Sequence, residues 1–247
     1  MNLTAVHTTT LKGIKLLSST AGRDRVNRFV QFFTKFLSLY LQDSADEELV
    51  AKLSKLSGTV SQSRKLMRIG RQIELLLGAY KTSKSGVKDD VVRMTTMVKQ
   101  LSFAGWLTFD TISWCQAIGL IVPESDEAKQ LTSDRANKLW LAGLTVSILG
   151  GMHKLQTVQT RISMEEKAVS MAKSSGKVDQ ASEENVKKLC REKNACISTL
   201  AHDVSDALVP LLLLDILPEF FPKTLVFAIG TVTSVTGGMP LWKAIKL

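Results

Sequence analysis

Residues 59–80 are the stretch that most restricts how this chain can fold, because they predict one helix with two opposed faces. At about 100° per residue, one side of this helix is apolar and the other is cationic. The apolar stripe consists of Leu66, Ile69, Ile73, Leu76, Leu77 and Tyr80. The cationic face consists of Arg64, Arg68 and Arg71, with Lys65 at its border. This division suits a helix lying in the plane of a membrane surface, although core helices of soluble proteins can show it too.

The two faces would contribute unequally to membrane binding. Burial of six large apolar side chains is worth about 10 kcal/mol gross, whereas each Lys or Arg near an anionic leaflet adds about 1 kcal/mol. The apolar stripe would therefore bind the bilayer, and the cationic face would orient the helix against lipid headgroups. Gly70 and Gly78 each weaken the isolated helix by about 1 kcal/mol relative to Ala, so we expect folding to be coupled to insertion.

Positive charge is concentrated at one end of the 247-residue chain. Residues 1–100 contain 17 Lys and Arg against 8 Asp and Glu, whereas residues 101–247 contain 15 of each. A basic region indicates either nucleic acid or an anionic membrane as partner. The chain has no zinc-finger spacing and no RNA-recognition signature, and its second half is rich in apolar runs. We therefore expect an anionic phospholipid membrane as partner and no nucleic acid.

Long apolar runs predict a membrane-embedded C-terminal region. The best candidate is 101–122, in which Asp110 is the one formal charge and which is long enough for the roughly 30 Å hydrocarbon core. Three further candidates are 139–152, 207–222 and 224–242. The predicted fold is therefore an all-α integral membrane protein with N-terminal amphipathic helices and about four membrane-embedded helical segments.

The charges of the loops suggest a topology. With four embedded segments, the Lys/Arg-rich polar loop 153–206 lies on the same side as the basic N-terminal region 1–100, in agreement with the positive-inside tendency. Both termini then face the cytosol. A version with only two spans, 101–122 and 224–242, also leaves both termini cytosolic but puts the basic loop on the wrong side. We accordingly divide the chain into a cytosol-facing region 1–100 and a membrane-embedded region 101–247.

Helix starts in the N-terminal region are predicted from capping residues. A weak pattern covers 3–19, and a sharper one covers 24–41 with Asp24 as its N-cap. The acidic cluster 43–48 is typical of a helix N-terminus, where carboxylates meet the positive end of the helix dipole. Thr59 or Ser61 would then cap the two-faced helix.

The sequence offers little that resembles a reaction centre. No metal-ligand spacing, phosphate-binding Gly-rich loop or nucleophile motif is present, so we expect no enzyme, no metal and no cofactor. The histidines are His7, His153 and His202, and the cysteines, whose odd number argues against a disulfide framework, are Cys115, Cys190 and Cys196. Asp110 and Asp215 are candidate intramembrane polar residues; each would serve a helix contact or a solute path, and the contact is favoured.

One block of sequence resembles the peroxin-11 family of peroxisomal membrane proteins. Residues 55–71 contain a Ser-Arg-Lys-x-x-Arg-x-Gly core before the apolar stripe, and a Gly-Arg-Asp-Arg pattern at 22–25 precedes an aromatic-rich helix. The apolar run 139–152 departs from the family, for which two spans are the common description.

The resemblance implies a peroxisomal membrane protein that elongates the membrane before fission and proliferation. Insertion of the two-faced helix into the cytosolic leaflet and self-association into homo-oligomers would supply the curvature. The apolar stripe would insert, and the cationic face would attract headgroups. A dynamin-like GTPase and a fission adaptor are the implied partners.

Two other readings stay open. The embedded segments could form a channel or carrier for small metabolites, with Asp110 and Asp215 lining the route. Alternatively, the apolar stripe could pack onto the protein's own helices and never touch lipid, which high burial of Ile73 and Leu77 would indicate.

Overall fold

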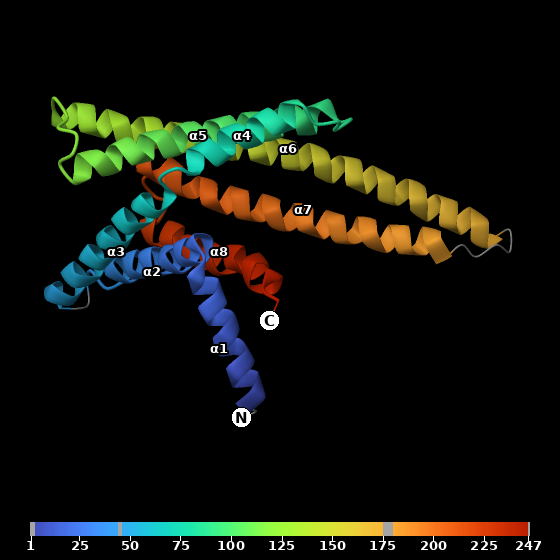
Figure 1. Cartoon of the computed structure of the whole chain (residues 1–247), viewed down its shortest axis with the longest axis horizontal. Helices are drawn as coiled ribbons and strands as arrows, with labels where there is room; N and C mark the ends of the chain where they lie inside the picture. Colours follow the sequence, from blue (N-terminus) through green and yellow to red (C-terminus); the bar gives the residue numbers. More distant parts are fainter. Residues whose placement is uncertain (1–2, 44–45, 175–179, 247) are drawn as a thin grey trace.

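The computed structural model describes residues 3–43, 46–174 and 180–246, and this part of the chain contains helices and no strand (Figure 1). Its elements are α1 (Leu3–Ser18), α2 (Thr20–Tyr40), α3 (Glu47–Arg68), α4 (Arg71–Ser83), α5 (Asp90–Ala117), α6 (Asp126–Ser174), α7 (Gln180–Leu213) and α8 (Lys223–Ala244). The prediction of an all-α protein is confirmed.

The first two helices meet at Ser19, and α1 projects away from the rest of the molecule (Figure 1). The Ser19 hydroxyl oxygen accepts a hydrogen bond of 3.0 Å from the backbone N–H of Gly22, which makes Ser19 the N-cap of α2. A Cβ on Gly22 would lie 2.0 Å from the carbonyl oxygen of Leu16, so this close junction requires glycine. The prediction that Asp24 caps the helix is wrong, because Asp24 lies inside α2.

The third helix begins at Glu47, well before the predicted cap at Thr59 or Ser61. Asp46 is the N-cap of α3, and its carboxylate accepts from the N–H of Glu48 at 3.0 Å. The acidic cluster is thus a helix N-terminus, as predicted from the helix dipole. Thr59 and Ser61 both lie within α3, so the prediction that either one caps a helix is wrong.

The predicted continuous helix over 59–80 is in fact two helices. It breaks at Ile69 and Gly70, where Gly70 adopts φ 91° and the N–H of Ile69 bonds to the Leu66 carbonyl at 3.2 Å. A positive φ is unfavourable for residues with a Cβ, so the glycine that weakens the isolated helix becomes the point where the chain bends. The first half of the two-faced segment therefore ends α3, and the second half forms α4.

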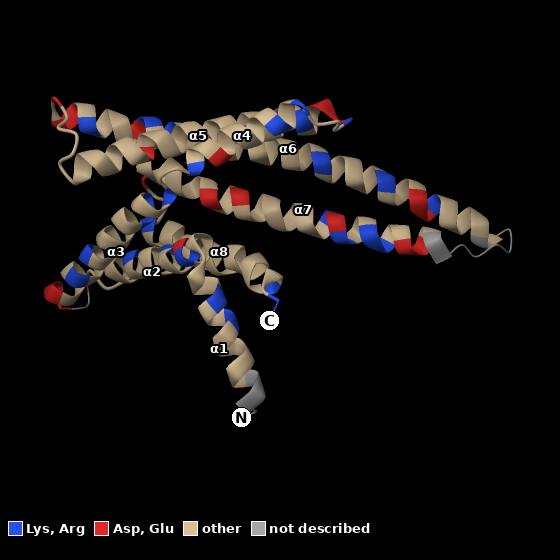
Figure 2. Cartoon of the chain, in the orientation of Figure 1, with Lys and Arg blue, Asp and Glu red and all other residues tan. Residues whose placement is uncertain are grey.

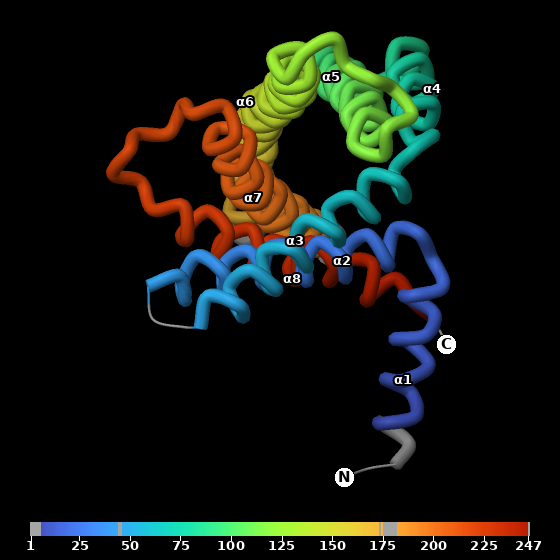
Figure 3. Tube along the Cα trace, turned by 90° about the vertical axis from the view of Figure 1, so that its left-hand side faces the viewer, coloured from blue at the N-terminus to red at the C-terminus, as the bar shows by residue number. Residues whose placement is uncertain are grey.

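The helices pack in two groups that meet across α3 and α7 (Figure 3). In one group α2 packs against both α3 and α8, and in the other α5 packs against α4 and α6, with α7 along α6. Phe32, Val209 and Val226 form a buried core where α2, α7 and α8 meet. A Cβ on Gly230 would lie 2.1 Å from the Phe32 ring, so this glycine lets α8 approach α2 closely.

The 49-residue helix α6 and the 34-residue helix α7 form a long hairpin that extends beyond the other helices (Figure 1). Val158, Ile162 and Leu189 form a separate buried cluster along the hairpin. The predicted segment 139–152 is not a separate helix, because it lies inside α6. Its glycines allow tight packing, since a Cβ on Gly143 would lie 2.5 Å from the ring of Phe103.

Two helices in the described residues are long and apolar enough to cross a membrane, judged by length and composition only. They are Ser182–Leu213 and Lys223–Ala244, and the second coincides with the predicted segment 224–242. The charged residues of α8 lie only near its ends (Figure 2). Little of its apolar window is buried inside the structure, and Val232 is 61% exposed.

The other predicted segments match the helices less well. Segment 101–122 is helical only as far as Ala117, because the chain turns at Gly119, where φ is 78°. Segment 207–222 is wrong as a single helix, since α7 ends at Leu213 and a loop leads to Pro222 at the start of α8. The count of four membrane-embedded segments stays a prediction.

The close approach of α8 to α2 predicts different effects for two glycines of the same helix. Gly230→Ala should lower the free energy of unfolding by about 1–3 kcal/mol, because the new methyl group overpacks against Phe32. Gly238→Ala is the matched control; a Cβ there meets nothing within 4 Å, so helix propensity should make this change neutral or stabilising. Thermal unfolding of the purified full-length protein measures both. Equal effects would contradict the packing of α8 on α2.

Candidate functional site

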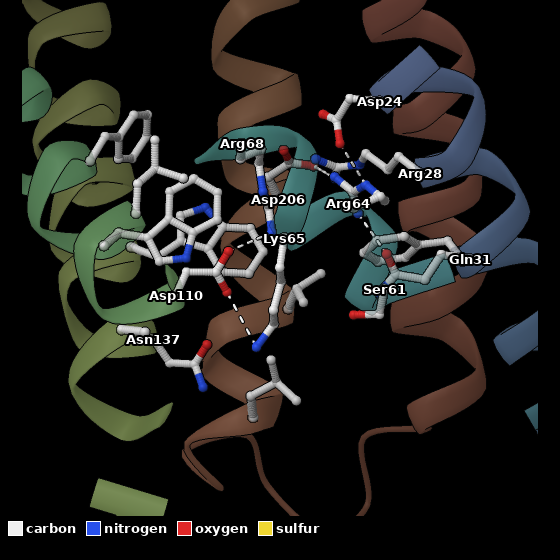
Figure 4. A pocket seen from close by; sticks show the side chains of 18 of the residues that line it. Asp24, Arg28, Gln31, Ser61, Arg64, Lys65, Arg68, Asp110, Asn137 and Asp206 are labelled. Atoms are coloured by element: carbon white, nitrogen blue, oxygen red, sulfur yellow. Dashed lines mark hydrogen bonds and ion pairs between the residues drawn. The ribbon is translucent and has the colours of Figure 1, made fainter. Parts of the chain in front are cut away.

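The cationic face turns toward the interior of the molecule. Arg64 is only 7% exposed, and its Nε donates to the Asp24 carboxylate at 2.9 Å (Figure 4). Its Nη1 donates to the side-chain oxygen of Gln31 at 2.6 Å. Because Asp24 and Gln31 lie about two turns apart on α2, these bonds fix α3 along that helix.

The next two cations of the segment reach across to α5. The Nη2 atom of Arg68 lies 2.7 Å from one carboxylate oxygen of Asp110, and Lys65 Nζ lies 3.4 Å from the other (Figure 4). Lys65 also donates to the hydroxyl of Ser113 at 3.1 Å. Asp110 is 7% exposed and serves a contact between helices, which was the favoured sequence interpretation.

Aromatic rings continue this contact into α6. The Arg68 guanidinium lies 5.0 Å from the ring centre of Trp106, and Trp106 stacks on Trp140 with their centres 5.0 Å apart. A cation over an aromatic face is attracted by the ring quadrupole. The helix pair α5 and α6 is thereby tied to the end of α3.

A further buried ion pair, which the sequence interpretation missed, links α2, α7 and α8. Arg28 Nη2 lies 2.5 Å from Asp206 Oδ1, and Arg28 Nε donates to the Ser234 hydroxyl at 3.2 Å. The Thr233 hydroxyl donates to Asp206 at 3.1 Å. The sequence offered only a weak signal, namely Asp206 just before an apolar run and Arg28 within the amphipathic pattern of 24–41.

A third polar contact joins α5, α6 and α7. Lys99 Nζ lies 3.6 Å from Asp203 and donates to the Ser147 hydroxyl at 2.6 Å. The Ser147 hydroxyl in turn donates to Asp203. Each of these three helices thus contributes one polar group to the interior.

These polar groups surround a cavity of about 720 Å³ between the two groups of helices (Figure 4). Its lining combines aromatic and aliphatic side chains such as Phe32 and Trp140 with many charged ones. Asn137, from α6, also lines the cavity. A volume of this size is typical of small-molecule sites.

Burial and neighbouring charges shift the pKa values of the pair that ties α2 to α3. Burial lowers the pKa of Arg64 to about 10, against the opposing attraction of Asp24, so Arg64 stays charged at neutral pH. Burial alone would raise the pKa of Asp24, but the charge and hydrogen bond of Arg64, with the charges of Arg68 and Arg71, hold that pKa below its ordinary value. The pair is therefore ionised on both sides.

The apolar stripe faces away from this interior. Its members are exposed by between 42% and 68%: Leu66, Ile69, Ile73, Leu76, Leu77 and Tyr80. The opposite face of α4 packs on α5, where a Cβ on Gly78 would lie 3.0 Å from the Gln100 side chain. The reading in which this chain's own helices cover the stripe is wrong for the chain by itself, because Ile73 is 68% exposed and Leu77 51%.

The predicted headgroup residues do not share one environment. Arg64, Lys65 and Arg68 point inward and are paired with Asp24 or Asp110. In this arrangement they are not placed to contact lipid headgroups, contrary to the prediction. Their charge is compensated by carboxylates that lie about 40 residues away in sequence. Arg71, after the break, is exposed.

The two candidate intramembrane acids also lie in different environments. Asp110 is buried in the cavity wall, whereas Asp215 is exposed in the turn after α7, with φ 53°. Asp is among the residues that tolerate this left-handed conformation in turns. The structure therefore does not bring Asp110 and Asp215 together along one route.

Metal and disulfide chemistry find no support in the described residues. In that part of the chain, no group of three or more His, Cys, Asp or Glu side chains is arranged to hold a metal ion. Cys115, Cys190 and Cys196 are all free thiols.

Comparison with known proteins places the chain in a family. Residues 12–242 match the family of peroxisomal biogenesis factor 11 (PEX11). The chain belongs to the PEX11 family. This confirms the resemblance that residues 55–71 indicated, and the match extends over nearly the whole chain.

Full-length relatives agree with this assignment. The chain is 26% identical to peroxisomal membrane protein PMP30A of Candida boidinii over 97% of this chain and 96% of the relative. It is 25% identical to peroxisomal membrane protein PMP27 of Saccharomyces cerevisiae, with 96% of each chain covered. It is 28% identical to peroxisomal biogenesis factor 11 of Schizosaccharomyces pombe, with 93% of each covered. No solved structure matches the chain significantly.

Membership of this family supports the assignment of the chain as a peroxisomal membrane protein with a role in peroxisome biogenesis. The names of its members describe membrane proteins and biogenesis factors and not enzymes.

The Asp24–Arg64 pair predicts a pH-dependent stability. Because the folded pKa of Asp24 is lowered, the pair stabilises the protein fully above the ordinary aspartate pKa, and this contribution is lost as the pH falls through the folded pKa. At pH 7, Asp24→Asn should cost about 3 kcal/mol of unfolding free energy, since it leaves the Arg64 charge buried without its partner. The gap between the variant and the parent should shrink as the pH falls below the ordinary aspartate pKa, and it should close below the lowered folded pKa of Asp24.

Thermal unfolding at pH 7 and pH 3 measures this difference. The control is Glu166→Gln, which neutralises an exposed carboxylate on α6 and should change stability little at either pH. A gap between Asp24→Asn and the parent that persists undiminished at pH 3 would contradict the role of the charge.

Proposed function

We propose that this protein remodels the peroxisomal membrane by inserting the apolar stripe into the cytosolic leaflet, which elongates the membrane before fission and proliferation. The observation that carries this proposal is the exposure of all six stripe residues on the surface of the folded chain. A soluble surface rarely leaves such a set of large apolar side chains in water. Lipid is the apolar environment available to a peroxisomal membrane protein.

The energy available for insertion is substantial. Each stripe residue is roughly half exposed, so its transfer into acyl chains would contribute about 1 kcal/mol, or about 6 kcal/mol for the stripe. Because α3 and α4 are already folded, this insertion does not have to pay for ordering the chain. The inserted helices would expand one leaflet relative to the other and bend the bilayer.

A neighbouring helix widens the apolar surface. On α5, Val91, Met94, Val98 and Leu101 recur at three- and four-residue spacing and are between 37% and 50% exposed. Since α4 packs against α5, both helices would lie in the same leaflet. The wedge therefore comprises the end of α3, the whole of α4 and the first part of α5.

Headgroup contact then falls to cations that are exposed near the stripe. Lys81 and Lys84 are exposed at the C-terminal end of α4. Each would add about 1 kcal/mol of attraction to an anionic leaflet. These residues take the role that the sequence interpretation gave to the whole cationic face.

Contact between the two ends of the chain supports their placement on one side of the membrane. Lys15 Nζ donates to the backbone carbonyl of Lys246 at 2.8 Å, and α1 packs against α8. We propose that both termini face the cytosol, where a dynamin-like GTPase and a fission adaptor would act. Homo-oligomers would add the curvature contributed by each copy.

Ile73→Glu tests the insertion directly. In full-length protein added to liposomes that contain anionic lipid, this change should abolish tubulation and weaken membrane binding at least about tenfold, because it removes an apolar anchor and puts a charge into acyl chains. Ile73 is 68% exposed, so the fold should be retained. Electron microscopy and liposome flotation provide the readouts.

Gln156→Glu is the matched control, since it adds the same charge at an exposed position on α6, far along the chain from the stripe. It should tubulate liposomes like the parent. Tubulation by Ile73→Glu at the level of the control would refute the insertion mechanism.

The cavity favours a second candidate function, a channel or carrier for small metabolites. Asp110 lines the cavity together with residues from both groups of helices. If solutes pass there, Asp110→Ala should remove conductance from planar bilayers that contain the parent protein. Conductance that is unchanged in Asp110→Ala, or absent from the parent, would leave membrane remodelling as the single proposal.

A further inference from the structure

The central cavity carries more positive charge than its carboxylates neutralise. Eight of its lining side chains are cations: Arg25, Arg28, Lys35, Arg64, Lys65, Arg68, Arg71 and Lys99. Four are carboxylates: Asp24, Asp110, Asp203 and Asp206. The excess is enclosed between helix groups, so the bulk solvent screens it less than it would screen a surface patch.

Every one of these carboxylates already has a cationic partner. Asp24 pairs with Arg64, Asp110 with Lys65 and Arg68, Asp203 with Lys99, and Asp206 with Arg28. Among the described residues, no carboxylate lies within 4.0 Å of the charged nitrogens of the other three cations, which are Arg25, Lys35 and Arg71. These three cations are thus available to an added anion.

Two buried nitrogen atoms in the cavity wall also lack a hydrogen-bond partner. They are Arg68 Nε and His202 Nε2, and the structure leaves only one other buried side-chain atom of the described residues unsatisfied. Buried polar atoms are normally paired, so an unpaired atom calls for an explanation such as a ligand or water. Both residues line the same cavity as the unpaired cations.

Two of these side chains, Arg25 and His202, lie close to the same glycine. A Cβ on Gly237 would lie 2.7 Å from His202 Nε2 and 3.0 Å from Arg25 Nη1. The two nitrogens, from α7 and α2, therefore approach the same point beside α8. Burial and repulsion by Arg28 lower the pKa of Arg25, against the attraction of Asp206 and Asp24, so its charge is held there at a cost.

We propose that this cavity binds a phosphate-bearing anion, attracted by the unpaired cations Arg25 and Lys35 of α2, with Arg68 and His202 in the surrounding wall. Arginine offers a planar fork of donors that matches phosphate oxygens, and a phosphate monoester carries nearly two negative charges at neutral pH. It would therefore offset the excess charge better than a single carboxylate. Arg25 and Lys35 lie ten residues apart on α2, about 15 Å, so the site is elongated.

The phosphate could belong to a phospholipid headgroup or to a soluble phosphate compound. Both present the same oxygens to the cations, and the cavity lies beside α7 and α8, the two helices that are apolar enough to span the membrane. The site is independent of the membrane wedge, because none of its residues belongs to the apolar stripe.

The test uses purified full-length protein in nanodiscs and measures thermal unfolding together with binding by calorimetry. In discs of phosphatidylcholine alone, inorganic pyrophosphate is titrated at constant ionic strength with KCl. In a second arm, phosphatidic acid replaces part of the phosphatidylcholine. We expect a saturable rise of the unfolding midpoint in at least one arm, since a ligand that binds the folded state stabilises it.

Arg25→Gln should weaken binding about tenfold, because it removes a charge-assisted contact. It breaks none of the ion pairs described above, and its midpoint without ligand reports whether it folds. Lys35→Gln is a second variant with the same expected loss. The matched control is Arg23→Gln, which removes the same charge from an exposed position on the same helix outside the cavity and should bind like the parent.

Each outcome has a defined meaning. A rise with pyrophosphate that Arg25→Gln weakens identifies a soluble phosphate compound, and a rise only with phosphatidic acid identifies a headgroup. The proposal is overturned if neither arm raises the midpoint, if KCl alone reproduces the rise, or if Arg23→Gln and Arg25→Gln weaken it equally. These results leave the tubulation test with Ile73→Glu unaffected, so the two proposals fail separately.

Discussion

The bridge from Asp110 to Lys65 and Arg68 is the interaction on which the rest of the arrangement depends. It joins the last turn of α3 to the middle of α5, and the second ion pair of the same helix, between Arg64 and Asp24, joins α3 to α2. Breaking one partner of a buried pair typically costs about 3–5 kcal/mol. Together these contacts fix the rotation of α3 about its own axis. They also hold the two groups of helices together, and the cavity lies between the two groups.

The rotation of α3 decides which surface the protein presents to its surroundings. Because Arg64, Lys65 and Arg68 are held inside, Leu66 on the opposite side of α3 points outward, and the rest of the apolar stripe continues outward on α4. This is the reverse of an ordinary soluble helix, which buries its apolar side. Contact of the outward side with an apolar medium is favourable, and this agrees with a member of a family of peroxisomal membrane proteins.

Periodicity predicted the helices and the division of the 59–80 segment into two faces, but it does not tell which face the protein covers. That choice depends on Asp24 and Asp110, which lie 40 and 42 residues from their partners in the sequence. No local pattern links residues so far apart. Gly70 indicated a weak helix, but helix propensity alone did not predict that the chain would bend there with a left-handed φ. Asp206 and Arg28 were missed for the same reason, since they are 178 residues apart.

The bend at Gly70 explains how one segment can serve both regions. In a straight helix through 59–80, the cations and the apolar side chains would lie on opposite faces along the whole length. The bend instead lets α3 keep its cations in the cavity while α4 lies along α5 with Ile73, Leu76 and Leu77 outward. The inward charges thus lie on α3, whereas most of the outward apolar surface lies on α4. An anion in the cavity would act on the α3 part and leave the surface of α4 as it is.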